Sequence, residues 1–429
     1  MPSSDSHGSS MPFASFRRSI MSIRSEHQVH SLELNHNSNI QEIDEEGFQK
    51  LVSTRFQELS VASADEFLSI AWIQKLLEVF TCCQEEFRIV LCKNKELLLK
   101  SPQDKLLSDY FDRTIKALDI CNAARDGIGK IRLWQKHLEI VVSALDSQQK
   151  MIGEGQLRRT RKSLMDLALV MLVEKETGSV FSQRNRSFGR HNKTKDHQRR
   201  PSGHSRSLSW SVSQSWSASK QLQSIASHLV APRGHEIAAT NGIASLIFTM
   251  NFILLFVLWV LVAALPCQDR SLQIHFAIPR QFSWSNALWL LHGRIMDEAK
   301  KPERHNSNGL LKEIYQLEKC VHHLTDLIDS AQLPFSEDQM EEVKLGGQDL
   351  SAVCEVLKTG LYPLERHLKE VFRKIISCRA EGLELMGKVK GNKSSNCGFS
   401  RYSYLLSGIN GCWIVASALG NMILQDSNS

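Results

Sequence analysis

The sequence predicts an all-α fold: two helical-bundle halves separated by a disordered, basic, Ser-rich linker and one long apolar helix expected to cross a membrane. Three observations lead to this prediction. Apolar residues recur at spacings of three and four along most of the chain, and no stretch alternates with a period of two. Residues 178–236 are dominated by Ser, Arg, His, Lys and Gln. Ile243 to Leu265 contains no charged residue.

Length and composition fit a protein with packed cores. The 429 residues suffice for two or three domains, with 42% hydrophobic and 23% charged residues. The net charge of +6 is mild, so we expect no nucleic-acid partner. The ten cysteines form no zinc-binding spacing, and we expect reduced thiols facing the cytosol. Arg17, Arg18 and Arg24 interrupt the first residues, so no signal peptide is expected.

Residues 1–40 are interpreted as a disordered N-terminal tail, because they are rich in Ser, His and Asn. A short stretch with Phe13, Phe16, Ile20 and Ile23 has arginines between its apolar residues. It is either an unstructured basic tail or a helix that forms on a partner or membrane surface.

Residues 41–177 are predicted to form the N-terminal helical bundle. Asp44 is placed to cap its first helix, and Ser101-Pro102 to begin a later one. The expected inner faces follow the helical period: Phe48, Val52, Phe56 and Leu59; Phe67, Ile73, Leu77 and Phe80; Tyr110, Leu118 and Cys121; Ile131, Trp134, Leu138 and Val141; Leu157, Leu164 and Met171.

Residues 178–236 carry almost no aliphatic side chains before Leu222, so they are predicted to be a disordered linker. Ser202 and Ser209 follow arginines in the pattern that basophilic kinases prefer, which makes them candidate phosphosites. The alternative is that these serines belong to an ordinary solvated basic segment.

Residues 243–265 form the predicted transmembrane helix. At ~1.5 Å per residue the run is roughly 34 Å long, against about 30 Å of hydrocarbon. Its candidate membrane-spanning residues are Ile243, Phe248, Phe252, Leu254, Phe256, Leu258, Leu261 and Leu265. The alternative is a fully buried central helix of a soluble bundle.

We expect a single-pass protein of the endoplasmic reticulum or plasma membrane with cytosolic domains. The cytosol is the alternative location. The few basic residues flanking the run do not define its orientation. Cys267 lies just beyond the run and is a candidate for S-palmitoylation, with an unmodified thiol as the alternative.

Residues 285–387 are predicted to form the C-terminal helical hairpin or bundle. Leu311, Leu317 and Leu324 belong to one apolar seam, and Leu350 and Leu357 begin another. Such seams fit a hairpin or a partner-binding coiled coil. Residues 388–429 are a divergent tail that matches nothing we recognise.

No catalytic motif is visible. Gly127-Ile128-Gly129-Lys130 lacks the spacing of a phosphate-binding loop. His322 and His323 are adjacent, so on a helix they point in different directions and do not easily bind the same metal ion. We therefore expect no enzyme, no cofactor, no metal site and no small-molecule substrate.

Several stretches resemble a known family. They are Phe16 to Ser19, Ser22 to Arg24, Phe48-Gln49 with Val52 and Arg55-Phe56, Ser209 to Ser213, Trp216 to Leu222, Pro266 to Arg270, Pro279 to Trp284, and Gly309 to Ile314. Together they resemble the plant BYPASS-like family, most closely its Roh branch, over about Phe13 to Gly387.

The resemblance implies a plant protein without known enzymatic activity. It implies roles in growth, in restraining a root-derived signal or in polarised secretion. For the Roh branch it implies binding to a subunit of the exocyst. The leading hypothesis is thus a membrane-associated adaptor, and the alternative is a soluble helical scaffold with 243–265 in its core.

Overall fold

The computed structural model describes residues 45–145, 153–176, 217–267, 277–330 and 336–391. All regular elements in these ranges are helices, which confirms the predicted all-α fold class. The predicted tail 1–40, residues 178–216 of the predicted linker, and residues 392–429 lie outside the described ranges.

The helices follow the apolar periods of the sequence. Before the linker they are α2 (Glu45–Ser60), α3 (Ile70–Lys93), α4 (Lys95–Leu98), α5 (Gln103–Leu145) and α6 (Glu154–Glu176). After it they are α8 (Ala218–Ala226), α9 (Gly234–Ala239), α10 (Ile243–Ala264), α11 (Ser285–Lys300), the 3-10 turn η1 (Pro302–Arg304), α12 (Lys312–Ser330) and α13 (Glu337–Gly391).

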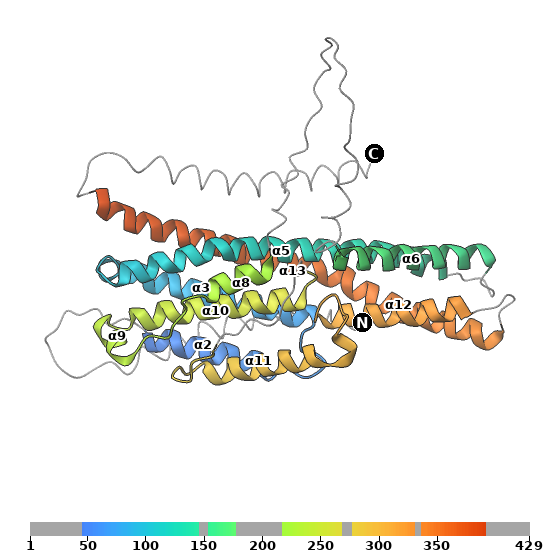
Figure 1. The fold of residues 1–429 in the computed structure, drawn as a ribbon, viewed down its shortest axis with the longest axis horizontal. Coiled ribbons are helices and arrows are strands. Elements are labelled where there is room, and N and C mark those ends of the chain that lie inside the picture. Colours follow the sequence, from blue (N-terminus) through green and yellow to red (C-terminus); the bar gives the residue numbers. More distant parts are fainter. Residues whose placement is uncertain (1–44, 146–152, 177–216, 268–276, 331–335, 392–429) are drawn as a thin grey trace, which may run out of the picture. The chain divides into compact units, whose positions relative to one another are not determined.

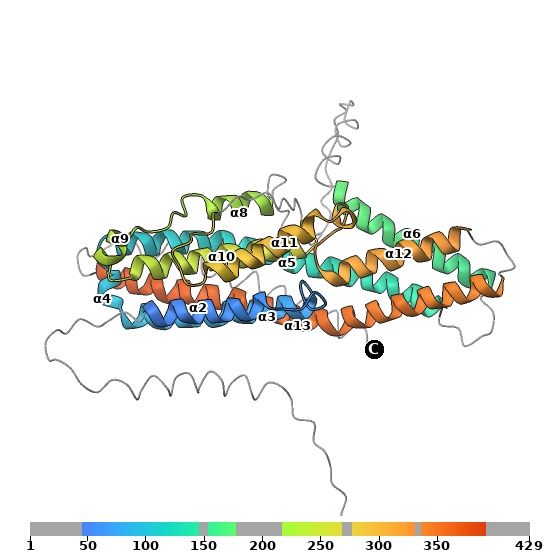
Figure 2. The same cartoon turned by 90° about the horizontal axis from the view of Figure 1, so that it is seen from below.

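Two very long helices, α5 and α13, organise the described bundle. They pack against each other, and both views show them side by side (Figures 1 and 2). Towards one end α3 packs on α13, and α8 and α10 pack on α5; α2 packs on α3 and α10, and α11 packs on α2. Towards the other end α6 packs on α5 and α12 packs on α13 (Figure 2). A glycine allows one close approach: a Cβ on Gly360 of α13 would lie 3.0 Å from Cγ2 of Ile70 on α3.

The predicted division into two halves is not a division in space. Contacts place the helices on both sides of the linker in one compact unit, Ile43–Ser429. The apolar seam of α13 contains Leu350, Leu357, Leu361 and Leu364, all buried. The helices α3 and α5, which precede the linker, cover α13 together with α12, its neighbour in the chain. An apolar seam packs wherever a complementary one exists, so separation along the chain is no barrier.

The interpretation of residues 217–236 as disordered linker is wrong. Ser217 caps α8 by accepting a hydrogen bond from the Lys220 backbone N–H. Ala218, Leu222 and Ile225 are fully buried along one face of this short helix, which packs on α5 and α10. These three apolar residues at helical spacing give α8 a face to bury.

Truncating a buried residue of α13 should destabilise the whole bundle. For Leu357→Ala we expect a loss of about 2–5 kcal/mol in the free energy of unfolding, because Leu357 is fully buried. The control is Leu133→Ala at a position 43% exposed on α5, with a loss within about 0.5 kcal/mol. Urea unfolding measures both. If Leu357→Ala left the unfolding transition of helices α2–α5 unchanged, the packing of α13 together with these helices would be contradicted.

Candidate functional site

The helix α10 is enclosed by protein on all sides. All of its residues are buried, and it packs against α2, α3, α5, α8 and α9. Among the described residues it is the one helix long and apolar enough to cross a membrane, with a mean hydropathy of 2.6. The same length and composition serve a core helix, so the contacts of its polar groups and its ends matter most.

The structure brings the predicted membrane-spanning residues together in one helix. Ile243, Phe248, Phe252, Leu254, Phe256, Leu258 and Leu261 lie in α10, and Leu265 follows it directly. All eight side chains are buried in the bundle.

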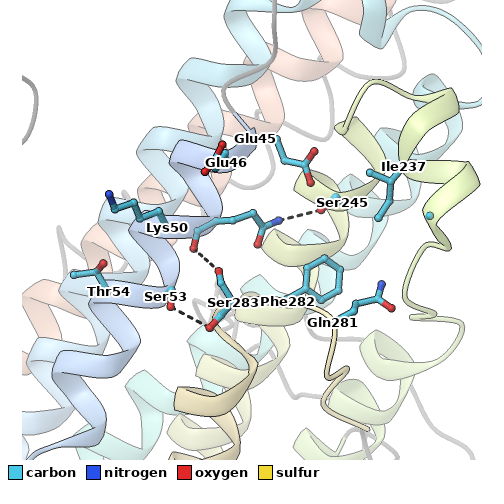
Figure 3. Close-up of a pocket in the computed structure, with 12 residues that line it drawn as sticks. Glu45, Glu46, Lys50, Ser53, Thr54, Ile237, Ser245, Gln281, Phe282 and Ser283 are labelled. Atoms are coloured by element: carbon cyan, nitrogen blue, oxygen red, sulfur yellow. Dashed lines mark hydrogen bonds between the residues drawn. The ribbon is translucent and has the colours of Figure 1, made fainter. Parts of the chain in front are cut away.

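Gln49 of α2 binds two of the polar residues of α10, whereas the Asn251 side chain donates to the Ile247 carbonyl oxygen of its own helix. Its Nε2 donates to Oγ of Ser245 at 3.0 Å and to Oγ1 of Thr249 at 2.9 Å. The indole N–H of Trp284 donates to Oε1 of Gln49 at 2.7 Å. The Ser283 hydroxyl donates to the Gln49 carbonyl oxygen at 3.3 Å (Figure 3). We call these five residues the Gln49 cluster; it satisfies α10 hydroxyls with protein partners.

Aromatic rings continue this contact along α10. Phe282 stacks on Phe248 with ring centroids 5.3 Å apart and on Trp284 at 5.0 Å. Phe56 of α2 meets Phe256 edge-on at 6.1 Å. Such pairs add about 0.5–1.5 kcal/mol each beyond the area that they bury. One side of α10 is thus shaped to fit α2 and the start of α11.

The segment from Gly309 to Glu313, here called the 309–313 segment, holds the carboxyl end of α10. The backbone N–H groups of Leu310 and Leu311 donate to the carbonyl oxygens of Ala263 and Ala264 at 3.0 and 3.1 Å. These carbonyls belong to the last turn, which has no partners within its own helix. A Cβ on Gly309 would lie 2.3 Å from the Ala264 oxygen, so only glycine allows this approach.

The same segment also holds the amino end of α3. The Lys312 N–H donates to the Leu68 carbonyl oxygen at 2.9 Å. Both carboxylate oxygens of Glu313 accept from the Ile70 N–H, at 3.0 and 3.1 Å. Burial raises the pKa of Glu313, and the Ile70 N–H opposes that shift. The segment therefore joins the end of one core helix to the start of another.

An open pocket of about 680 Å³ lies over the Gln49 cluster (Figure 3). Residues of α2, α9, α10 and the loop before α11 line it, including Glu45, Lys50, Ile237, Gln281 and Phe282. Its walls offer carboxylates, amides and one aromatic face. No recognisable nucleophile–base pair is among the lining residues.

The described residues also bear on the remaining sequence motifs. No group of three or more His, Cys, Asp or Glu side chains there is placed to hold a metal ion. Burial raises the pKa of the Cys121 and Cys378 thiols to about 12, which keeps them protonated and unreactive. The glycines of Gly127-Ile128-Gly129-Lys130 lie in the middle of α5, where no phosphate loop can form.

The other predicted site residues are less informative. Ser202 and Ser209 lie outside the described residues. Cys267 is half-buried and packs against the core just beyond α10. Sequence reasoning missed the roles of Gln49 and Glu313. A signal existed, because both lie in or beside stretches that carry the family resemblance, but a single polar residue on a helix reveals no partner.

Fold and site together define an all-helical protein built around an enclosed apolar helix. A family model described as "Protein ROH1-like" matches residues 9–386. The chain therefore belongs to the ROH1-like family, which confirms the resemblance to the Roh branch.

Two relatives from Arabidopsis thaliana match along nearly their whole length. Protein ROH1D is 48% identical over 391 residues, covering 88% of this chain and 98% of the relative. Protein ROH1A is 33% identical over 426 residues, covering 90% and 98%. The UPF0496 protein 4 of Oryza sativa subsp. japonica is 20% identical over 288 residues, covering 67% and 54%. None of these names carries an enzymatic activity. No solved structure matches the chain.

Replacing the central residue of the Gln49 cluster should destabilise the bundle. For Gln49→Leu we expect a loss of about 1–3 kcal/mol, because Ser245 loses its bond to the Gln49 amide and Thr249 and Trp284 retain only their mutual bond at 3.3 Å. The exposed neighbour gives the control, Lys50→Ala, with a change within about 0.5 kcal/mol. Equal urea midpoints for the two variants would show that the cluster does not hold α10.

Adding a single methyl group to Gly309 should weaken the contact with α10. For Gly309→Ala we expect a loss of about 1–3 kcal/mol from crowding against the Ala264 oxygen. Gly293→Ala in α11 is the matched control, because its Cβ would meet nothing within 4 Å. There the better helix propensity of alanine should stabilise by up to about 1 kcal/mol. Thermal unfolding of both variants should therefore show shifts of opposite sign.

Proposed function

We propose that this chain is a non-enzymatic helical adaptor whose bundle binds a protein partner and in which α10 is a core helix. The observation that carries the proposal is the protein contact at the polar groups and the carboxyl end of α10. A span would not need Gln49 or the 309–313 segment. The bundle would then act by recruiting partners in growth or polarised secretion, and the family resemblance implies an exocyst subunit as the partner.

The free energy of packing the surrounding helices against α10 supports its assignment as a core helix. The side chains of α10 leave water equally well in lipid or in a protein core, so they do not decide between the two. If α10 left for a membrane, the rings of Phe56 and Trp284 that pack on it would lose their cover. Exposing both costs roughly 3–6 kcal/mol, before the broken bonds of Gln49 are counted.

The second candidate is the membrane-spanning adaptor, with cytosolic domains on a single-pass helix. The length and hydropathy of α10 favour it. In that version α10 is lipid-exposed and the surrounding helices close over the space that it leaves.

Alkaline carbonate washing of plant membranes that contain the full chain separates the two versions. We expect release into the supernatant, because a core helix gives no anchor. Retention in the pellet, with a protease-protected terminus, would reject the core assignment. Leu258→Asp supplies a second readout: a core helix should unfold with a buried carboxylate, whereas Ile140→Asp at a position 52% exposed should not.

Partner binding is tested separately. The purified chain and a purified exocyst subunit of the helical-rod type should co-elute from a sizing column. Absence of binding at high concentration of both proteins would reject this partner, and would leave the assignment of α10 standing on the carbonate result.

A further inference from the structure

The helix α8 is a short amphipathic helix that lies on two longer ones. It packs on α5 and α10, and its buried face consists of Ala218, Leu222 and Ile225. These residues follow one another at spacings of four and three, so they project from one side of the helix. Lys220 and Gln223 are exposed on the other side. The helix α8 therefore lies on the bundle as a bound peptide helix lies in an apolar groove.

Side chains hold α8 on the bundle. In the described part of the chain, the backbone hydrogen bonds of α8 stay within the helix or reach the residues directly beside it. In a side-chain bond to α5, Lys116 Nζ donates to Oγ of Ser224 at 2.6 Å. The 309–313 segment differs, because its backbone N–H groups bind other helices. Release of α8 would thus leave α5 and α10 without a broken backbone bond.

The length of α8 makes its helical structure dependent on the surface below it. The helix Ala218–Ala226 has 9 residues. Isolated helices shorter than about 12–15 residues are marginal in water. His228 follows in the left-handed conformation, with φ at 62°, as is common directly after a helix. A short segment of this kind opens locally at a lower free energy than the core helices need for unfolding.

The groove between α5 and α10 defines what can replace α8. It accepts a small residue, a leucine and an isoleucine at positions i, i+4 and i+7, as α8 shows. At its edge Lys116 offers an ammonium group to a polar side chain of the bound helix, which is Ser224 in the free chain. An amphipathic helix with this pattern would bury the same apolar surface as α8. Two helices cannot occupy the groove together.

We propose that the groove between α5 and α10 is the docking site for an amphipathic helix of a partner protein, and that α8 fills this site in the free chain. The occupant is a helix because the groove already holds one. The helix α8 then acts as an internal competitor, and the partner binds when α8 leaves. The inference rests on the proposed adaptor function for the existence of a partner, and it specifies the surface that the partner uses.

Hydrogen exchange of the full chain, followed by mass spectrometry, tests whether α8 opens on its own. We expect the amides of residues 221–226 to exchange roughly tenfold or more faster than those of Ala117 and Leu118 in α5, because they need only a local opening. Equal protection of the two helices would mean that α8 leaves only when the bundle unfolds, and would overturn the proposal.

A fluorescent peptide with the sequence of residues 216–228 is the probe for the groove. Leu222→Asp in the full chain should release α8, because a carboxylate is costly in an apolar site. Fluorescence polarisation should show that this variant binds the peptide. The unchanged chain should bind it roughly tenfold or more weakly, since its own tethered α8 competes. Gln223→Asp, at an exposed position of α8, is the matched control and should bind as weakly as the unchanged chain.

Other results would contradict the proposal. If circular dichroism showed that Leu222→Asp unfolds the bundle, α8 would be an inseparable part of the core. A folded variant that does not bind the peptide, or that binds a peptide carrying Leu222→Asp equally well, would show that the groove is no helix site. The exocyst co-elution test is separate: a chain that binds the peptide but not that subunit keeps the groove as a docking site and loses only that partner.

Discussion

The carbonyl groups that end α10 need hydrogen-bond donors, and much of the bundle depends on how the chain supplies them. Leu310 and Leu311 give their N–H groups to Ala263 and Ala264, and Gly309 must come close enough for this. Two residues later, Glu313 accepts from the first N–H of α3. A short crossing segment thereby fixes two core helices, and α12 begins in the direction that it sets. The apolar side chains supply most of the free energy of folding, whereas these few hydrogen bonds determine where α10 ends and where α3 begins.

The chain illustrates why an apolar run alone does not identify a membrane span. Hydropathy and length describe the side chains of α10, and those side chains fit lipid and protein equally. The informative groups are the exceptions, such as Ser245 and Thr249, which contact a side chain of another helix here, whereas in lipid only carbonyl groups of their own helix would accept from them. In this bundle the Gln49 side chain supplies a donor to these hydroxyls, and its own oxygen accepts from the Trp284 indole N–H. The arrangement of polar contacts around an apolar helix is thus better evidence of its environment than its composition.

The helices themselves could be predicted from the sequence, because their apolar residues repeat at the helical period. The buried faces of α2, α3 and α5 contain the residues that the spacing indicated, including Phe48, Phe80 and Trp134. The pairing of α13 with α3 and α5 could not be predicted, since many apolar seams are interchangeable and a linker hides which ones meet. For the candidate site, the residues of α10 were predictable, but the partners of Gln49 and Glu313 lie about 200 and 243 residues away. Bonds across such separations have no local signal.

The place of α10 in the chain has a consequence for synthesis on the ribosome. Domains fold largely from the amino terminus as the chain emerges. When α10 leaves the ribosome, α2, α3, α5 and α8 are already made, but α11 and the 309–313 segment are not. The most apolar helix of the protein therefore waits with one side and its last carbonyls uncovered until about fifty more residues have followed, at ~5–20 residues per second. During these seconds the nascent chain presents to chaperones and to the membrane-targeting machinery a segment that its own fold later conceals.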